Sequence, residues 1–233
     1  SHNLSEESNS VSITTGLLKT IPLAAGAYHS LQVQKDGTIK AWGDGYEHDK
    51  TIEIDKAVAV AGGNNTVALK DDGTVWEIDS NGIIEEVPNL CDVTFITAGW
   101  SHNIAIKGDG TVWTWGSNGY GQLGDGTNSS SSKPVQVNEL RSIICTAAGG
   151  WHSLAIRSDG TVWAWGRNNY GQLGNNMYTN SNKPVQVVNL SDVISVAAGE
   201  YHSLALKSDG TVWAWGRNNY GQLGNGEYGY SYM

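Results

Sequence analysis

The sequence predicts an all-β fold of short antiparallel strands, and three observations lead to that prediction. One repeat occurs five times along the 233 residues, and each copy carries an Asp-Gly pair between two β-prone segments. Thirty glycines against four prolines indicate many tight turns, and ten tryptophans with ten tyrosines suit strands better than helices. Four strands can be recognised in each long copy, so we expect a β-propeller of five four-stranded blades.

The repeat is anchored by a glycine that starts each copy. These glycines are spaced by 36, 37, 50 and 50 residues, and they are Gly26, Gly62, Gly99, Gly149 and Gly199. The Asp-Gly pairs keep the same spacing, so two independent anchors agree. In the two shorter units a tight turn replaces a long loop, which indicates that they are shortened blades with the same plan.

Within one long unit the strands follow from the residue pattern. HSLAIR (152–157) and TVWAWG (161–166) flank Asp159-Gly160, where glycine tolerates the positive φ of a hairpin turn. A loop rich in glycine and asparagine leads to KPVQV (183–187), whose proline stands near the strand start, where a lost N–H is tolerated. The small residues of ISVAAG (194–199) suit the innermost strand, because blades converge on the axis.

The two ends of the chain predict how the propeller closes. Aligned on the repeat, Met233 matches Lys183, and Val11 matches the next residue, Pro184. We therefore expect the N-terminal segment (11–23) to complete the last blade, so that 11–233 form a single five-unit domain without open sheet edges. A fragment of a longer propeller is the alternative. Residues 1–10 are polar and are expected to form a flexible tail or a cloning remnant.

Charge and cysteine content narrow the function classes. With 14 Lys+Arg against 23 Asp+Glu, the net charge of −9 argues against nucleic acid and anionic membrane surfaces as partners. No apolar run is long enough for a membrane helix. Cys91 and Cys145 fall at different repeat positions, so we expect two free thiols, with a disulfide as the alternative.

Three segments of the repeat, AGxxHSLAL, DGTVWAWG and NxxGQLG, resemble the repeat of the regulator of chromosome condensation family, especially in its bacterial members. The resemblance covers nearly the whole chain. It implies a propeller that acts through protein–protein surfaces, and it slightly favours an extracellular or cell-surface bacterial location. The founding member is a seven-bladed nucleotide exchange factor, whereas this chain has five visible units. No insertion resembles an exchange-factor wedge.

Recurring histidines and tryptophans are predicted to be structural. A histidine recurs at one repeat position in four of the five units (His29, His102, His152 and His202), and this spacing leaves neighbours too far apart to share a metal ion. We expect their rings to face the next blade and to bond to backbone. The tryptophans paired at i and i+2 are expected to form the core between blades. No catalytic, cofactor or metal site is predicted, since no nucleophile elbow, HExxH or phosphate loop is present.

A binding surface is predicted at one end of the propeller, where the loop after the innermost strand and the GQLG loop open on the same face. It gathers aromatic and charged residues that the fold does not require, and these are Tyr28, Trp100, Trp151, Glu200, Tyr201, Tyr120, Tyr170, Tyr220, Arg167 and Arg217. This composition predicts a non-enzymatic protein-binding module. Alternatives are a carbohydrate-binding lectin, an enzyme of unrecognised type, and a chain constructed chiefly to fold. The oligomeric state stays open.

Overall fold

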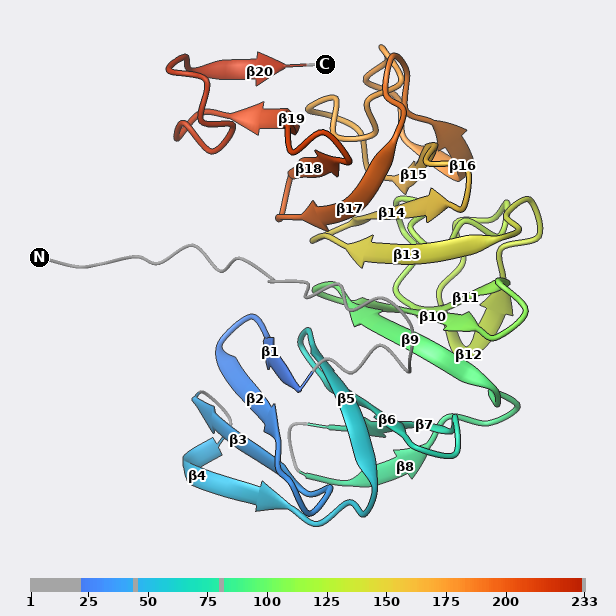
Figure 1. Ribbon diagram of the computed structural model, residues 1–233, viewed down its shortest axis with the longest axis vertical. Coiled ribbons are helices and arrows are strands. Elements are labelled where there is room, and N and C mark those ends of the chain that lie inside the picture. Colours follow the sequence, from blue (N-terminus) through green and yellow to red (C-terminus); the bar gives the residue numbers. More distant parts are fainter. Residues whose placement is uncertain (1–21, 44–45, 80–81, 232–233) are drawn as a thin grey trace, which may run out of the picture.

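The computed structural model describes residues 22–43, 46–79 and 82–231, in which every regular element is a β-strand (Figure 1). The strands form five antiparallel four-stranded sheets, here named blades 1 to 5 in chain order. They are β1 (Leu23–Ala25), β2 (His29–Val33), β3 (Ile39–Gly43), β4 (Tyr46–Ile52), β5 (Ala57–Gly62), β6 (Thr66–Lys70), β7 (Val75–Ile78), β8 (Ile84–Glu86), β9 (Val93–Ala98), β10 (His102–Lys107), β11 (Val112–Gly116), β12 (Ser131–Gln136), β13 (Ile143–Ala148), β14 (His152–Arg157), β15 (Val162–Gly166), β16 (Ser181–Gln186), β17 (Val193–Ala198), β18 (His202–Lys207), β19 (Val212–Asn218) and β20 (Gly229–Ser231). The five four-stranded blades confirm the predicted propeller.

Each blade begins at the propeller axis. The ends of the innermost strands β1, β5, β9, β13 and β17 surround one axial cavity, which is lined mainly by alanine and glycine from all five blades. Small side chains are needed here because five strands converge on one axis. The cavity measures about 50 Å³, which is room for one or two water molecules.

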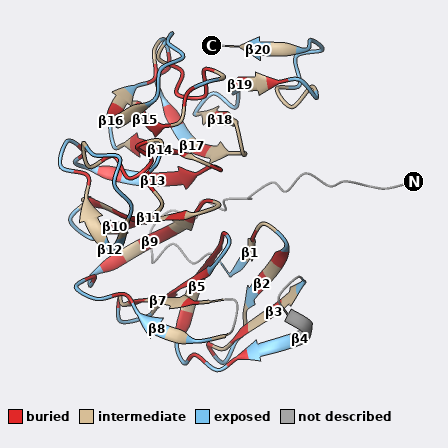
Figure 2. Ribbon diagram, turned by 180° about the vertical axis from the view of Figure 1, so that it is seen from behind, coloured by how far each residue is buried: buried red, intermediate tan, exposed pale blue. Residues whose placement is uncertain are grey.

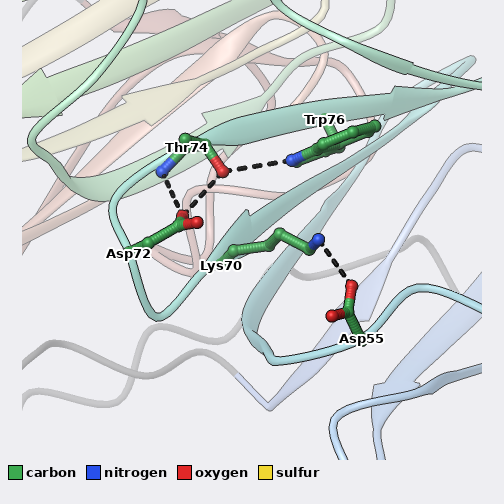
Figure 3. A network of polar contacts seen from close by, with 5 residues as sticks. All are labelled: Asp55, Lys70, Asp72, Thr74 and Trp76. Atoms are coloured by element: carbon green, nitrogen blue, oxygen red, sulfur yellow. Dashed lines mark hydrogen bonds and ion pairs between the residues drawn. The ribbon is translucent and has the colours of Figure 1, made fainter.

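The Asp-Gly turns are hairpins with their own hydrogen bonds, as Figure 3 shows for blade 2. One carboxylate oxygen of Asp72 accepts hydrogen bonds from the backbone N–H and the hydroxyl of Thr74, at 2.9 and 2.7 Å. The Thr74 hydroxyl oxygen accepts from the indole N–H of Trp76 at 3.1 Å. The same Asp–Thr pairing recurs in every blade, so these carboxylates serve the turns.

Histidines connect neighbouring blades. The Nε2 atoms of His102 and His152 each lie 2.9 Å from the hydroxyl of a serine in the next blade, Ser153 and Ser203. Each serine donates its proton to a backbone carbonyl, so the histidine must donate its Nε2 proton to the serine. The rings face the next blade as predicted. The prediction of a direct bond to backbone was wrong, because a hydroxyl side chain lies between ring and carbonyl.

The second tryptophan of each predicted pair is buried at the same boundaries, as expected, whereas the first is only partly buried. Trp165 and Trp215 are fully buried, and their indole N–H groups donate to the backbone carbonyls of Gln122 and Gln172 at 2.8 and 2.9 Å. These two carbonyls also accept the serine hydroxyls described above. Each boundary between long blades is therefore held by buried apolar area together with a shared hydrogen-bond acceptor.

Figures 1 and 2 show the five blades as an arc, with an opening between blade 5 and blade 1. The face of blade 5 that borders the opening keeps the residue types of the buried boundaries. Val212 is 67% exposed there, whereas the matching Val162 of blade 4 is fully buried. A methyl group placed at Gly224 would have no neighbour within 4 Å. A methyl group at the matching Gly174 of blade 4 would contact the indole of Trp215.

The closing segment predicted from the repeat (11–23) lies mostly outside the described residues. Its last residue, Leu23, begins the innermost strand of blade 1. The outermost described strand of blade 5 is β20, and within the described residues it pairs only with the 216–218 end of β19. In blade 4 the outermost strand also pairs alongside Trp163 and Ala164. Pairing of residues before 22 with the remaining part of β19 stays a prediction.

Two further expectations concern the cysteines and the membrane. Cys91 is exposed and Cys145 is buried, and no disulfide joins them in the structure. Among the described residues, no helix has the length and apolarity needed to cross a bilayer.

Candidate functional site

Two sets of loops meet at one end of blades 3 to 5. The first set follows the innermost strands and carries Trp100, Trp151 and Tyr201. The second set follows the third strands. Backbone hydrogen bonds join the sets, because the N–H groups of Arg167 and Arg217 donate to the carbonyls of Trp151 and Tyr201 at 2.9 and 3.0 Å. The two loops of each blade are therefore held side by side, and the same arrangement recurs in the next blade.

The aromatic rings of the first set contact one another across blade boundaries. The ring centroids of Trp100 and Trp151 lie 4.8 Å apart, edge to face, and those of Trp151 and Tyr201 lie 5.4 Å apart, stacked. From the second set, Tyr120 contacts Trp151 at 6.2 Å and Tyr170 contacts Tyr201 at 5.1 Å. These separations are those of favourable aromatic pairs.

Two arginines lie among these rings. The Arg167 guanidinium lies 4.8 Å from the centroid of Tyr120 and 5.0 Å from that of Tyr201. The Arg217 guanidinium lies 5.5 Å from Tyr170 and 5.1 Å from Tyr220. Cation–π attraction stabilises such contacts. We call the whole set the aromatic–arginine ladder, and its members are Trp100, Tyr120, Trp151, Arg167, Tyr170, Tyr201, Arg217 and Tyr220.

The ladder leaves hydrogen-bonding capacity unused. Within the described part of the chain, neither Arg167 nor Arg217 forms an ion pair, and the Nε atoms of both are buried without a hydrogen-bond partner. Guanidinium groups have five N–H donors in a planar fork. The stacked arginines can therefore bind carbonyl or carboxylate groups of a molecule that approaches the ladder.

Glu200 adds a negative charge at one edge of the ladder. Burial of the Tyr201 phenol, together with its hydrogen bond to the Glu200 carboxylate, raises the pKa of Tyr201 to about 12. The phenol therefore stays protonated and donates to the carboxylate at physiological pH. The Tyr201 ring lies in the centre of the ladder, where it stacks on the Trp151 ring.

The structure brings together nine of the ten residues predicted for this surface. The exception is Tyr28, which lies on blade 1 at 71% exposure and makes no ring contact with the ladder. Sequence reasoning missed Tyr230 of β20, whose ring lies 5.1 Å from that of Tyr170. Tyr230 was missed because the outermost strand of blade 5 was expected from the other end of the chain.

The described residues offer little that resembles a catalytic or metal site. They contain no group of three His, Cys, Asp or Glu side chains placed to hold an ion. The histidines at the blade boundaries are occupied with serine or threonine hydroxyls, at His29 with Thr66. The axial cavity, at about 50 Å³, is well below the roughly 300–1,000 Å³ of small-molecule pockets.

Comparisons with known proteins place this geometry in context. A family profile described as the RCC1-like domain matches residues 3–231. A search of curated proteins gives no match. Among solved structures, Prp20p from Saccharomyces cerevisiae is similar with a TM-score of 0.81 and 22% identity, over 91% of this chain and 61% of Prp20p. Human WBSCR16 is similar with a TM-score of 0.75 and 21% identity, over 84% of this chain and 62% of that protein.

A more distant likeness is the ectodomain of the receptor kinase ACR4 from Arabidopsis thaliana, with a TM-score of 0.56 and 16% identity, over 90% of this chain and 70% of the other. At these identities the likenesses show the fold alone. The chain spans about three fifths of the length of the yeast and human proteins. Prp20p is described with binding to Gsp1p and histones, and yeast RCC1 with bound Kap60.

Proposed function

Because the chain belongs to the RCC1-like domain family, we propose that it is a non-enzymatic binding module whose partner protein docks on the aromatic–arginine ladder. Family membership supports protein interaction in general, since the similar yeast protein is described with protein partners. The ladder supports the choice of surface. It is built from Trp, Tyr and Arg, which are the residue types enriched where interfaces concentrate their binding energy.

The observation that carries the proposal is the unused capacity of the two arginines. A structural role explains why Arg167 and Arg217 stack on rings, but their terminal guanidinium N–H groups form no ion pair within the described residues. A partner that supplies backbone carbonyls or carboxylates would satisfy these donors. Exposed Tyr220 at the edge of the ladder would add contact area.

A lectin function has less support. Sugar binding at the mouth of the axial channel would need a cavity much larger than about 50 Å³. Stacking of sugars on the ladder would compete with the arginines, which already occupy faces of Tyr120, Tyr170 and Tyr201. We therefore favour a protein partner over a glycan.

Affinity capture tests the proposal. The wild-type chain and the variant Trp100→Ala/Trp151→Ala/Tyr201→Ala are used as bait, and captured proteins are identified by mass spectrometry. We expect the variant to lose the partner by at least about tenfold, because truncation of interface aromatics typically costs 2 kcal/mol or more.

The matched control changes the opposite end of the propeller, with Ser158→Ala/Ser208→Ala beside the exposed Asp-Gly turns. This control should capture the partner as well as the wild type does. Undiminished capture by the ladder variant would reject the proposed surface. Multivalent glycan-array hits that the ladder variant abolishes would instead support the lectin alternative.

A further inference from the structure

We propose that a cavity between blades 2 and 3 binds an ammonium or guanidinium group, presented by a lysine or arginine side chain of the partner protein. The cavity measures about 190 Å³, and its lining includes Glu77, Trp100, Asn103 and Trp115. Trp100 also belongs to the ladder, so a protein that covers the ladder reaches the cavity. This inference rests on the proposed function and adds the chemistry of one contact.

The cavity exists because blade 2 is short. At the boundaries between blades 3, 4 and 5, the GQLG loops supply Gln122 and Gln172, whose carbonyls meet the tryptophans of the following blade. In blade 2 the chain passes from β7 to β8 through residues 79–83, which are too few for such a loop. The space that the loop fills elsewhere is therefore open beside Trp115.

Glu77 takes over the role of the missing carbonyl. Its Oε1 atom accepts hydrogen bonds from the indole N–H of Trp115 at 2.8 Å and from the side-chain amide of Asn103 at 2.9 Å. At the other boundaries a neutral carbonyl satisfies the same indole N–H. The indole therefore needs an acceptor but no charge, and a glutamine at this position would serve equally well.

The charge of Glu77 has no partner in the described part of the chain. The ion pairs found there are Lys70 with Asp55 and Lys183 with Glu139, and neither involves Glu77. A half-buried carboxylate without a counter-ion is unfavourable, and a cation placed in the cavity would offset this cost.

The walls of the cavity also favour a cation. Trp100 and Trp115 are indole rings, which attract cations most strongly among the aromatic side chains. Asn64, which is held by a hydrogen bond from its amide nitrogen to the hydroxyl of Ser101 at 3.3 Å, lines the same space and adds an amide oxygen as an acceptor. A volume of about 190 Å³ suits the end of one long side chain and is small for a larger ligand.

The test uses the purified chain without any partner. The probes are Nα-acetyl-lysine amide and Nα-acetyl-arginine amide, and the neutral comparison probe is Nα-acetyl-citrulline amide. Binding is followed by NMR through the indole N–H resonances of Trp100 and Trp115. We expect the cationic probes to shift both resonances with weak, saturable affinity and the neutral probe to leave them unchanged.

The variant Glu77→Gln keeps the hydrogen-bond acceptor and removes the charge, so it should weaken cation binding about tenfold or more. The control Glu86→Gln removes an exposed carboxylate that lies opposite Trp76, on the other face of the sheet from Glu77, and should bind as the wild type does. Equal binding of the citrulline probe, or unchanged binding by Glu77→Gln, would overturn the proposal. If a variant fails to fold, the comparison of the three probes on the wild-type chain still shows whether the cavity prefers a cation.

Two further outcomes would assign the cavity differently. Much tighter binding of a free diamine such as cadaverine than of the amides would identify a small-molecule site. Shifts caused by saccharides would identify a sugar site. Either outcome would overturn the proposal that a side chain of the partner protein occupies the cavity. The variant Tyr170→Ala/Tyr201→Ala changes ladder residues that neither line the cavity nor contact the Trp100 ring, so it should bind the probes normally. Failure of partner docking on the ladder and failure of cation binding in the cavity can thus be told apart.

Discussion

The substitution Trp165→Ala is expected to lower the free energy of unfolding by about 3–5 kcal/mol. Trp165 is fully buried at the boundary between blades 3 and 4, and its indole N–H donates to the carbonyl of Gln122 at 2.8 Å. Its ring also packs so closely against Gly124 that a methyl group at that glycine would lie 2.7 Å from the Nε1 atom of Trp165. Truncation would leave a cavity and remove a hydrogen bond at the same time.

Chemical denaturation monitored by tryptophan fluorescence or circular dichroism measures this effect. Trp163→Ala is the matched control, because it lies two residues earlier on the same strand. Its ring is only partly buried and stacks under Arg157, at 4.1 Å from the guanidinium carbon to the ring centroid. We expect Trp163→Ala to lower the free energy of unfolding clearly less than Trp165→Ala does. A loss below about 1 kcal/mol for Trp165→Ala would show that the blades are not held together in this way.

Acid is expected to destabilise the protein as the pH falls from about 6.5 to about 3, and the contribution of the histidines begins well above the pH at which carboxylates titrate. Burial lowers the pKa of His102 to about 4, and burial together with the neighbouring histidines lowers the pKa of His152 to about 3. In the unfolded chain both groups would bind protons near pH 6.5. Below that pH the unfolded state binds more protons than the folded state, so stability falls as pH falls.

The expected slope is about 1.4 kcal/mol per pH unit for each neutral buried histidine, so the two together would cost roughly 6 kcal/mol between pH 6.5 and pH 4. Denaturation midpoints measured from pH 8 to pH 4 test this. The variant His152→Gln should show about half the slope over this range, whatever its stability at pH 8. The pKa values of the turn aspartates, such as Asp159, are also lowered, by hydrogen bonds from Thr161, so these groups add to the loss of stability only from about pH 5 downward. Equal slopes in variant and wild type would contradict the account.

Much of the fold could be predicted because the same pattern of strand, turn and small residues occurs five times in the sequence. The Asp-Gly pairs fix the hairpins, and the small residues of the innermost strands identify the axis. The tryptophan pairs were assigned to the blade boundaries on strand alternation alone, and Trp165 and Trp215 are buried there. The direction in which the histidines point followed from the same alternation.

Other features could not be read from the repeat because they depend on where blades meet. The acceptor for His152 is a serine 51 residues away in the next blade, and no pattern within one unit identifies it. No sequence pattern identifies Glu77, although its carboxylate accepts the indole hydrogen bond that a loop carbonyl accepts at the boundaries between the long blades. Tyr230 joins the ladder through β20, a strand of three residues without a strong β signal.

For the candidate site, repeat arithmetic placed the aromatic residues on one face but could not give their mutual contacts. The stacking of Arg167 on rings from blades 3, 4 and 5 depends on the angle between neighbouring blades. Tyr28 occupies the equivalent repeat position on blade 1 but lies apart from the ladder, so repeat position alone does not place a residue in it.

Hydrogen–deuterium exchange on the chain with and without its captured partner would test partner docking on the aromatic–arginine ladder most directly. We predict slower exchange in the loops 99–101, 149–151 and 199–201 and in the loops 117–122 and 167–172, with no change at the Asp-Gly turns. Protection confined to the Asp-Gly turns, or to the exposed face of blade 5 around Val212, would contradict docking on the ladder.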